Sequence, residues 1–182
     1  ATLERLADLA PAIVVMEFGP ALEGEEMIQK ILRSTADALR WVRREVVERM
    51  NRGLGIEAIL HDITFPPELF DQPWMRPLYG HPDYLVRDVF RAENGWWDRN
   101  PTNLHPAPPD AAAAAVLSAI TDRKTVLNRA RELAAAGESQ LALHVIDLLA
   151  LAPGDDPEVA EARAFKAHLC RTLSQAATSF VS

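Results

Sequence analysis

The chain has 182 residues, of which 48% are hydrophobic and 25% charged, and this ordinary globular composition excludes wholesale disorder. The formal net charge of −7 argues against a general nucleic-acid surface, because such a surface needs a basic face. No apolar run approaches the roughly twenty residues of a membrane span. The single cysteine, Cys170, excludes an internal disulfide and a paired-cysteine zinc or redox motif. We expect a soluble protein, with the cytoplasm favoured and export of a larger parent protein left open.

Residues 2–9 are typical of a short amphipathic helix, and residues 12–16 form a compact apolar run that predicts a β-strand. A lone strand of this length is not stable by itself. Since no obvious partner strand follows, we expect an orphan strand that pairs with something outside the chain. This expectation favours a fragment of a larger protein.

A long helix is predicted from Glu25 to Met50, with Gly53 as its stop. Its apolar residues repeat every three or four positions: Ile28, Ile31, Leu32, Thr35, Leu39, Val42, Val46 and Met50. Trp41 lies roughly 140° from this stripe at the helical angle of 100° per residue. Two alternatives are open for Trp41. Either it anchors a second contact surface with Val47 at its edge, or a neighbouring loop covers it.

The middle of the chain is rich in proline and aromatic residues. We expect a short helix at 56–63, an ordered loop at 65–80 and a helix at 82–94 that ends at Gly95. Trp96 to Pro101 then predicts a tight turn anchored by aromatic side chains.

The last third is helical, with predicted helices at 109–120, 122–136, 138–152 and 157–177. The spacing of Ala130, Leu133, Gly137, Ala142 and Pro153 resembles one tetratricopeptide repeat. Small residues at 130 and 142 would let two helices approach closely, although a plain helical hairpin is the alternative. The predicted fold class is mainly α: a helical bundle with a tetratricopeptide-like hairpin within residues 107–182 and one short orphan strand near the start.

A more specific resemblance covers most of the chain. Residues 2–20 look like the closing helix and strand of a metallo-β-lactamase-type domain. The following motifs, in this order, resemble the helical dimerisation domain of the alkyl sulfatases: Met50-Asn-Arg-Gly-Leu54, Phe65-Pro-Pro67, Leu78-Tyr-Gly80, Val86-Arg-Asp-Val-Phe90, Gly95-Trp-Trp-Asp98 and Asn100-Pro-Thr-Asn-Leu104. The resemblance implies a metallo-β-lactamase remnant at 1–20 and a dimerisation domain at 21–182.

The resemblance also implies a function. Alkyl sulfatases are zinc-dependent hydrolases of long-chain sulfate esters, with most zinc ligands upstream of any residue present here. Their helical domain holds two subunits together and walls the substrate pocket. We therefore expect a non-catalytic accessory domain without a cofactor or metal ligand of its own, whose partners are a second copy and the parent catalytic domain. The alternative is a tetratricopeptide-like adaptor for another protein, and a third hypothesis is an autonomous small hydrolase.

Two positions depart from the family pattern. Phe18 stands where the superfamily has a zinc-binding histidine, and phenylalanine offers no lone pair to a metal. Tyr84 and Leu85 stand where the sulfatases have a His-Asn pair. These departures put the sulfatase activity of the parent protein in question, or they indicate a divergent branch of the family that acts on another ester.

The candidate residues for a substrate-pocket wall are Tyr79, His81, Tyr84, Arg87, Trp96 and Asn100. His81 follows the Tyr-Gly motif, and arginine beside aromatic rings could receive a sulfate or carboxylate. The alternative is that Arg87 is a solvated helix residue and that the tryptophan pair belongs to the core. We expect Tyr79, Arg87, Trp96 and Asn100 to form one connected cluster. Trp41 and Val47 are the candidates for the dimer interface.

Overall fold

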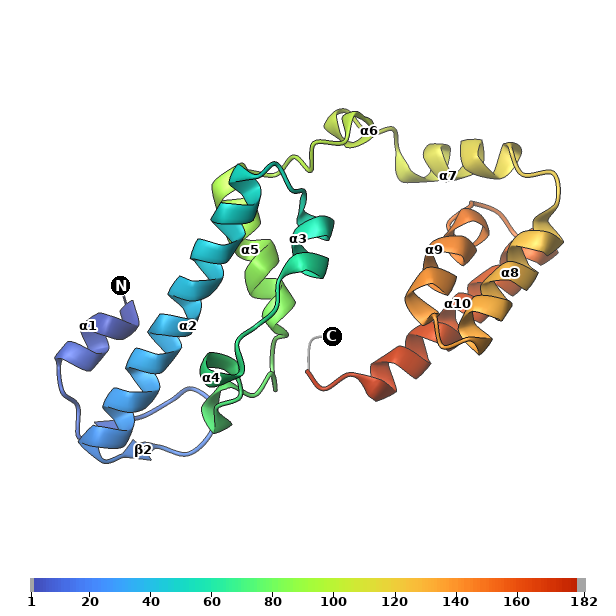
Figure 1. The fold of residues 1–182 in the computed structure, drawn as a ribbon. Coiled ribbons are helices and arrows are strands. Elements are labelled where there is room, and N and C mark those ends of the chain that lie inside the picture. Colours follow the sequence, from blue (N-terminus) through green and yellow to red (C-terminus); the bar gives the residue numbers. More distant parts are fainter. Residues whose placement is uncertain (1, 180–182) are drawn as a thin grey trace. The chain divides into compact units, whose positions relative to one another are not determined.

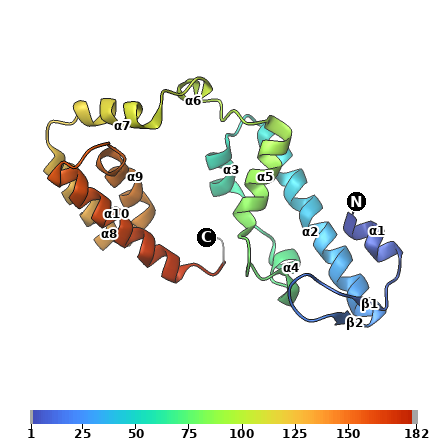
Figure 2. The same ribbon diagram turned by 180° about the vertical axis from the view of Figure 1, so that it is seen from behind.

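The computed structural model describes residues 2–179, which divide into two compact units. The first unit comprises the residues up to Arg99, and the second comprises Asn100–Thr178. Each unit is built mainly of helices around a core of its own (Figures 1 and 2). The prediction of a mainly α fold is confirmed.

The first unit begins with helix α1 (Thr2–Asp8) and two short strands, β1 (Ile13–Val14) and β2 (Leu22–Glu23). The strands pair antiparallel, with Ile13 opposite Glu23 and Val14 opposite Leu22. The expectation of an orphan strand is therefore wrong. Gly19, with a φ of 98°, lies in the reversal between the strands, and a two-residue strand is too short to show the alternating pattern that would have revealed β2.

Helix α2 (Glu25–Asn51) ends just before Gly53, as the sequence predicts, and the φ of that glycine is 87°. Its first half packs against α1 and the hairpin, where Ala7, Ile28 and Leu32 form a small core. Its second half packs against α3 (Ile56–Asp62) and α5 (Pro82–Asn94), as Figure 1 shows. The members of this larger core are Val42, Val46, Ile56, Ile59, Ile63, Val86 and Phe90.

The buried face of α2 differs from the predicted stripe near its middle. Leu39 is 40% exposed, and Ala36 and Ala38, which the stripe did not include, are buried. The two halves of the helix are covered from different sides, so that the buried positions do not follow one straight stripe.

The segment between α3 and α5 holds two short helices where a loop was expected: α4 (Pro67–Phe70) and the 3-10 turn η1 (Pro73–Met75). Each begins at a proline, whose fixed φ suits the first helical turn. Trp41 is half-buried under this segment, with ring centroids 5.9 Å from Phe65 and 5.6 Å from Phe70. Of the two alternatives for Trp41, this packing favours cover by the neighbouring segment.

The second unit contains α6 (Pro101–Leu104), α7 (Pro109–Ser118), α8 (Arg123–Ala135), α9 (Ser139–Ala150) and α10 (Pro157–Ala176). Helices α8, α9 and α10 pack together. Ala130 and Ala142 are fully buried, as expected of small residues between closely approaching helices. Asp122 caps α8 by accepting a hydrogen bond from the Thr125 N–H at 3.0 Å.

Within residues 2–179, no helix is both long and apolar enough to cross a membrane.

Candidate functional site

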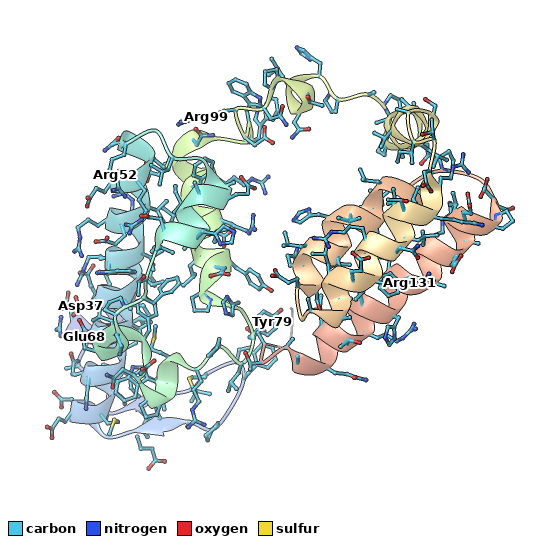
Figure 3. All side chains as sticks on the ribbon, turned by 45° about the vertical axis from the view of Figure 1, so that its right-hand side comes forward. Asp37, Arg52, Glu68, Tyr79, Arg99 and Arg131 are labelled. Atoms are coloured by element: carbon cyan, nitrogen blue, oxygen red, sulfur yellow. The ribbon has the colours of Figure 1, made fainter. Side chains whose placement is uncertain are left out.

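The first unit contains an open pocket of about 420 Å³ between η1, the residues that follow it and the start of α5. Its lining combines aromatic and apolar side chains with a few charged ones: Phe70, Trp74, Met75, Arg76, Pro77, Tyr79, Gly80, His81, Pro82, Tyr84, Leu85 and Asp88. Three of the predicted site residues, Tyr79, His81 and Tyr84, are thus brought together. Figure 3 labels Tyr79 on the segment that precedes α5.

The wall formed by η1 is attached to α2. The indole Nε1 of Trp74 donates a hydrogen bond to the Ser34 hydroxyl at 3.1 Å, and the Lys30 ammonium lies 5.4 Å from the centre of the Trp74 ring. The Thr35 hydroxyl lies 3.7 Å from the sulfur of Met75. These contacts hold a short turn, which has little hydrogen bonding of its own, against the longest helix of the unit.

His81 has a structural role at the pocket as well as an exposed ring. Its Nδ1 accepts a hydrogen bond from the Asp83 N–H at 3.3 Å and so caps α5. Its ring meets Tyr84 edge-on at 6.2 Å between centroids. A neutral ring that accepts at Nδ1 carries its proton on Nε2, which leaves a donor for a bound group.

Arg76 is the pocket residue that sequence reasoning missed. It is exposed, lines the pocket, and forms no ion pair with any residue of the described part of the chain. A guanidinium beside aromatic and apolar walls suits an anionic head group joined to an apolar chain. In the sequence, the position of Arg76 next to Pro77 in an aromatic-rich segment could have indicated a role at the pocket. Asp88 supplies a carboxylate on the α5 side of the same pocket.

The other predicted residues lie elsewhere. Arg87 is exposed on α5 and does not line the pocket, whereas Leu85 and Asp88 of the same helix do. Trp96 is 69% exposed and also lies outside the lining. Asn100 belongs to the second unit, where its side chain caps α6 by accepting from the Thr102 N–H at 3.1 Å. The pocket therefore does not assemble Arg87 and Trp96 with Tyr79.

The turn at 95–100 is braced by a residue that was not predicted to do so. The Asn94 amide donates to the carbonyl of Trp97 at 2.6 Å and accepts from the Arg99 guanidinium at 3.3 Å. The side chain of Asn94, at the end of α5, thus holds the reversing backbone.

The two interface candidates on α2 have different surroundings. Trp41 packs inside its own unit, as described above, which leaves little of it for a partner. Val47 is half-buried in a shallow hollow of about 600 Å³ whose other lining residues are polar: Arg40, Arg43, Arg44, Glu48 and Asn51. A role of either residue in an interface remains a prediction.

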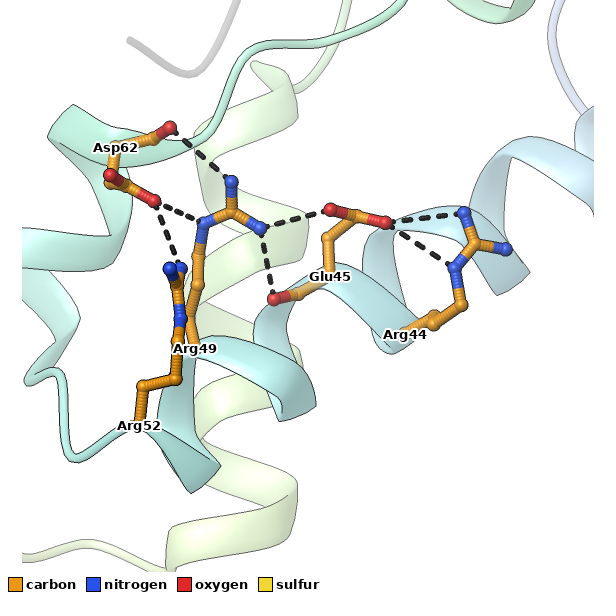
Figure 4. Close-up of polar contacts among 5 residues, drawn as sticks. All are labelled: Arg44, Glu45, Arg49, Arg52 and Asp62. Carbon is orange, nitrogen blue, oxygen red and sulfur yellow. Dashed lines mark hydrogen bonds and ion pairs between the residues drawn. The ribbon is translucent and has the colours of Figure 1, made fainter.

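A network of charged residues joins α2 to α3 beside this hollow (Figure 4). Arg49 bonds Asp62 at 2.8 Å and Glu45 at 3.0 Å, and Arg52 reaches Asp62 at 3.2 Å. Burial opposes the ionisation of Glu45, but hydrogen bonds from Arg49 and Arg44 outweigh it and lower the pKa of Glu45. All these partners are engaged with one another, so the network is structural.

No three side chains of His, Cys, Asp or Glu within residues 2–179 are placed to hold a metal ion. His81 and Asp83 face each other at 3.4 Å without a third donor of this kind. Phe18, at the position of the superfamily histidine, is 76% exposed in the β1–β2 connection. The described residues do not fit a zinc site, and we assign no metal chemistry to them.

Comparison with known families is decisive for most of the chain. The family model described as alkyl sulfatase dimerisation matches residues 55–182. The chain belongs to the alkyl sulfatase dimerisation family. The match includes the pocket segment, α5 and the whole second unit.

Three curated proteins are similar over most of the chain. A linear primary-alkylsulfatase of Pseudomonas sp. is 28% identical over 177 residues, which is 97% of this chain and 33% of that protein. An (R)-specific secondary-alkylsulfatase of Pseudomonas sp. is 27% identical over 95% of the chain and 26% of its own length. An alkyl/aryl-sulfatase of Saccharomyces cerevisiae is 29% identical over 77% of the chain and 21% of its own length. The chain thus spans a third or less of these relatives.

The fold has solved counterparts. The stereoselective inverting sec-alkylsulfatase Pisa1 of Pseudomonas sp. matches with a TM-score of 0.82 and 24% identity, over 98% of this chain and 28% of that one. A double mutant of the same enzyme matches with a TM-score of 0.83. At this identity the likeness shows that the fold is shared.

Proposed function

We propose that this chain is the non-catalytic dimerisation and accessory part of an alkyl-sulfatase-like hydrolase of metallo-β-lactamase fold. The observation that carries the proposal is the family match over residues 55–182, joined to an alignment that spans 97% of this chain but only 33% of an alkylsulfatase. In this proposal, residues 1–20 are the end of the catalytic domain, and any zinc chemistry belongs to residues outside this chain.

We further propose that the pocket around Tyr79, His81 and Tyr84 forms part of the wall of the substrate site. Its aromatic and apolar lining suits an alkyl chain, and the guanidinium of Arg76 suits the sulfate. The named activities of the relatives supply the substrate class: alkyl sulfates.

Titration of the purified chain with octyl sulfate, kept below its micellar concentration, tests the pocket. We expect a saturable change in the fluorescence of Trp74, which lines the pocket, and a loss of that change in Trp74→Phe. Arg76→Gln should weaken binding of octyl sulfate about tenfold, because one charge-assisted hydrogen bond is lost. Arg87→Gln is the matched control and should have no effect. Equal binding by octanol, or equal effects of the two arginine variants, would contradict an anion-specific pocket.

Light scattering at micromolar concentration tests the dimerisation role. We expect a mass of twice the 20.1 kDa of one chain. A monomer at every concentration would overturn this part of the proposal.

A second candidate function, an adaptor for another protein, rests on the α8–α9 hairpin with Ala130 and Ala142 buried in it. About three such repeats are normally needed for a stable array, and one hairpin followed by α10 falls short of that. We therefore favour the dimerisation role.

A further inference from the structure

Helix α9 is apolar on nearly all its sides, although α7, α8 and α10 leave part of its surface exposed. Ala142, Ile146, Leu149 and Ala150 are buried toward the core of the second unit. On the other side, Leu141 is 49% exposed, Leu148 is 42% exposed and Leu151 is 55% exposed. A helix that is apolar all round is normally buried all round. The exposed side of α9 is therefore a surface that lacks its cover.

The residues on the exposed side of α9 are spaced symmetrically, so that their separations are the same in both directions along the chain. Leu141, His144, Leu148 and Leu151 are separated by three, four and three residues. Steps of three and four are those of a helix–helix seam. An antiparallel copy related by a twofold axis near position 146 would place Leu141 opposite Leu151 of the partner subunit, and His144 opposite Leu148 of the partner subunit. A twofold interface requires this self-complementarity.

A groove of about 490 Å³ lies beside the seam, between α7 and α9 of the same unit. Its α7 side is lined by Pro109, by the carboxylate of Asp110, and by the short side chains of Ala112, Ala113 and Val116, which leave room for an inserted leucine. The carboxylate of Asp147 borders the groove but lies 2.6 Å from the Lys166 ammonium, so its charge is compensated within the chain. Leu148 and Leu151 also line the groove, and an antiparallel copy would place His144 and Leu141 of the partner subunit opposite them.

We propose that the exposed face of α9, with the adjoining α7–α9 groove, is the surface at which a second copy of this chain docks antiparallel. The inference rests on the proposed dimerisation function and names its surface. A stable dimer buries more than about 1,000 Å² in total, or about 500 Å² on each copy. This area requires the α7 side of the groove as well as the leucines of α9. The rival hollow on α2 is lined mostly by polar residues, and its Arg43 already pairs with Glu93 at 2.7 Å.

Two matched glutamate substitutions separate the surfaces. Leu148→Glu should weaken dimerisation at least about thirtyfold, because it places a charge in the centre of an apolar seam. Val47→Glu, at the hollow on α2, should leave the dimer intact. Sedimentation equilibrium gives the dissociation constants. Since Leu148 is exposed, the variant should keep its helical circular dichroism, and Leu151→Glu provides a second variant with the same expected effect.

Cysteine cross-linking tests the antiparallel register in a Cys170→Ala background, since Cys170 is exposed. The double variant His144→Cys, Leu148→Cys should form a covalent dimer on oxidation, and each single variant should do so poorly. Efficient cross-linking of single variants would contradict the antiparallel arrangement. A wild-type dimer that persists in Leu148→Glu and Leu151→Glu would overturn the surface but leave the dimerisation function. A monomeric wild-type chain would overturn both.

Discussion

Arg49 is the side chain through which α2 and α3 are joined by charge. It is only 12% exposed and bonds both Glu45 and Asp62. Burial opposes its positive charge, but the hydrogen bonds that Arg49 donates to these two carboxylates outweigh burial and raise the pKa of Arg49. Arg44 offers a natural contrast, because it is 65% exposed and pairs with Glu45 at 3.2 Å.

Replacing Arg49 by alanine should lower the free energy of unfolding by about 1–2 kcal/mol. The variant leaves two carboxylates without their shared cation and removes the packing of a mostly buried side chain. Urea denaturation followed by tryptophan fluorescence measures the change. Arg44→Ala is the control and should change stability by less than about 0.5 kcal/mol. Equal losses in the two variants would show that the network around Arg49 contributes nothing beyond surface charge.

Glu45 makes the stability of the first unit depend on pH. Its pKa in the folded chain lies below the ordinary value of about 4.3 for an unfolded glutamate. Its contribution is therefore fully present above about pH 4.3 and is lost as the pH falls through the lower folded pKa. We expect Glu45→Gln to flatten the dependence of unfolding free energy on pH below about pH 4.3. Parallel curves for the wild type and the variant would contradict this assignment.

At the scale of elements, the α8–α9 hairpin depends on the small size of the residues between its helices. Ala130 and Ala142 are fully buried, and no larger side chain fits without displacing a helix. The sequence spacing predicted this correctly, because a repeat-like pattern of small residues is a local property of two adjacent helices.

Ala142→Leu should destabilise the second unit by about 1–3 kcal/mol through overpacking. Ala135→Leu, at an exposed position on α8, is the matched control and should stay within about 0.5 kcal/mol of the wild type. Far-ultraviolet circular dichroism during thermal unfolding measures both. If Ala142→Leu proved neutral, the helices would have more space between them than the burial of Ala142 indicates.

At the scale of the molecule, the two units have separate cores, and the unfolding of each can be followed by a different spectroscopic probe. All four tryptophans precede residue 100 and so belong to the first unit, which makes tryptophan fluorescence a probe of that unit alone. Circular dichroism reports helices of both. Ile59 and Ile146 are fully buried, and each belongs to the core of its own unit.

Ile146→Ala should cost the second unit about 2–5 kcal/mol and leave the fluorescence-detected transition unchanged. Ile59→Ala should cost the first unit a similar amount and shift that transition. Each variant is followed by both probes in the same denaturant series. A shift of the fluorescence transition in Ile146→Ala would show that the units unfold as one cooperative body.

The sequence by itself determined the long helices, their ends and the family. Capping residues, prolines at first turns and glycines such as Gly53 and Gly95 act locally, so α2, α5 and the helices after Pro109 lie close to their predicted bounds. The ordered motifs from Met50 to Leu104 indicated the alkyl sulfatase dimerisation family, and the family match confirmed it.

Only the tertiary structure decided which side chains meet. The pairing of β1 with β2, the cover over Trp41 and the presence of Arg76 in the pocket all join residues across a turn or between different elements. A periodic pattern shows that a face is apolar, but it does not show what covers that face. For the same reason the sequence pattern of Leu141, Leu148 and Leu151 is typical of core residues. Only the packing of the second unit shows that these leucines are exposed.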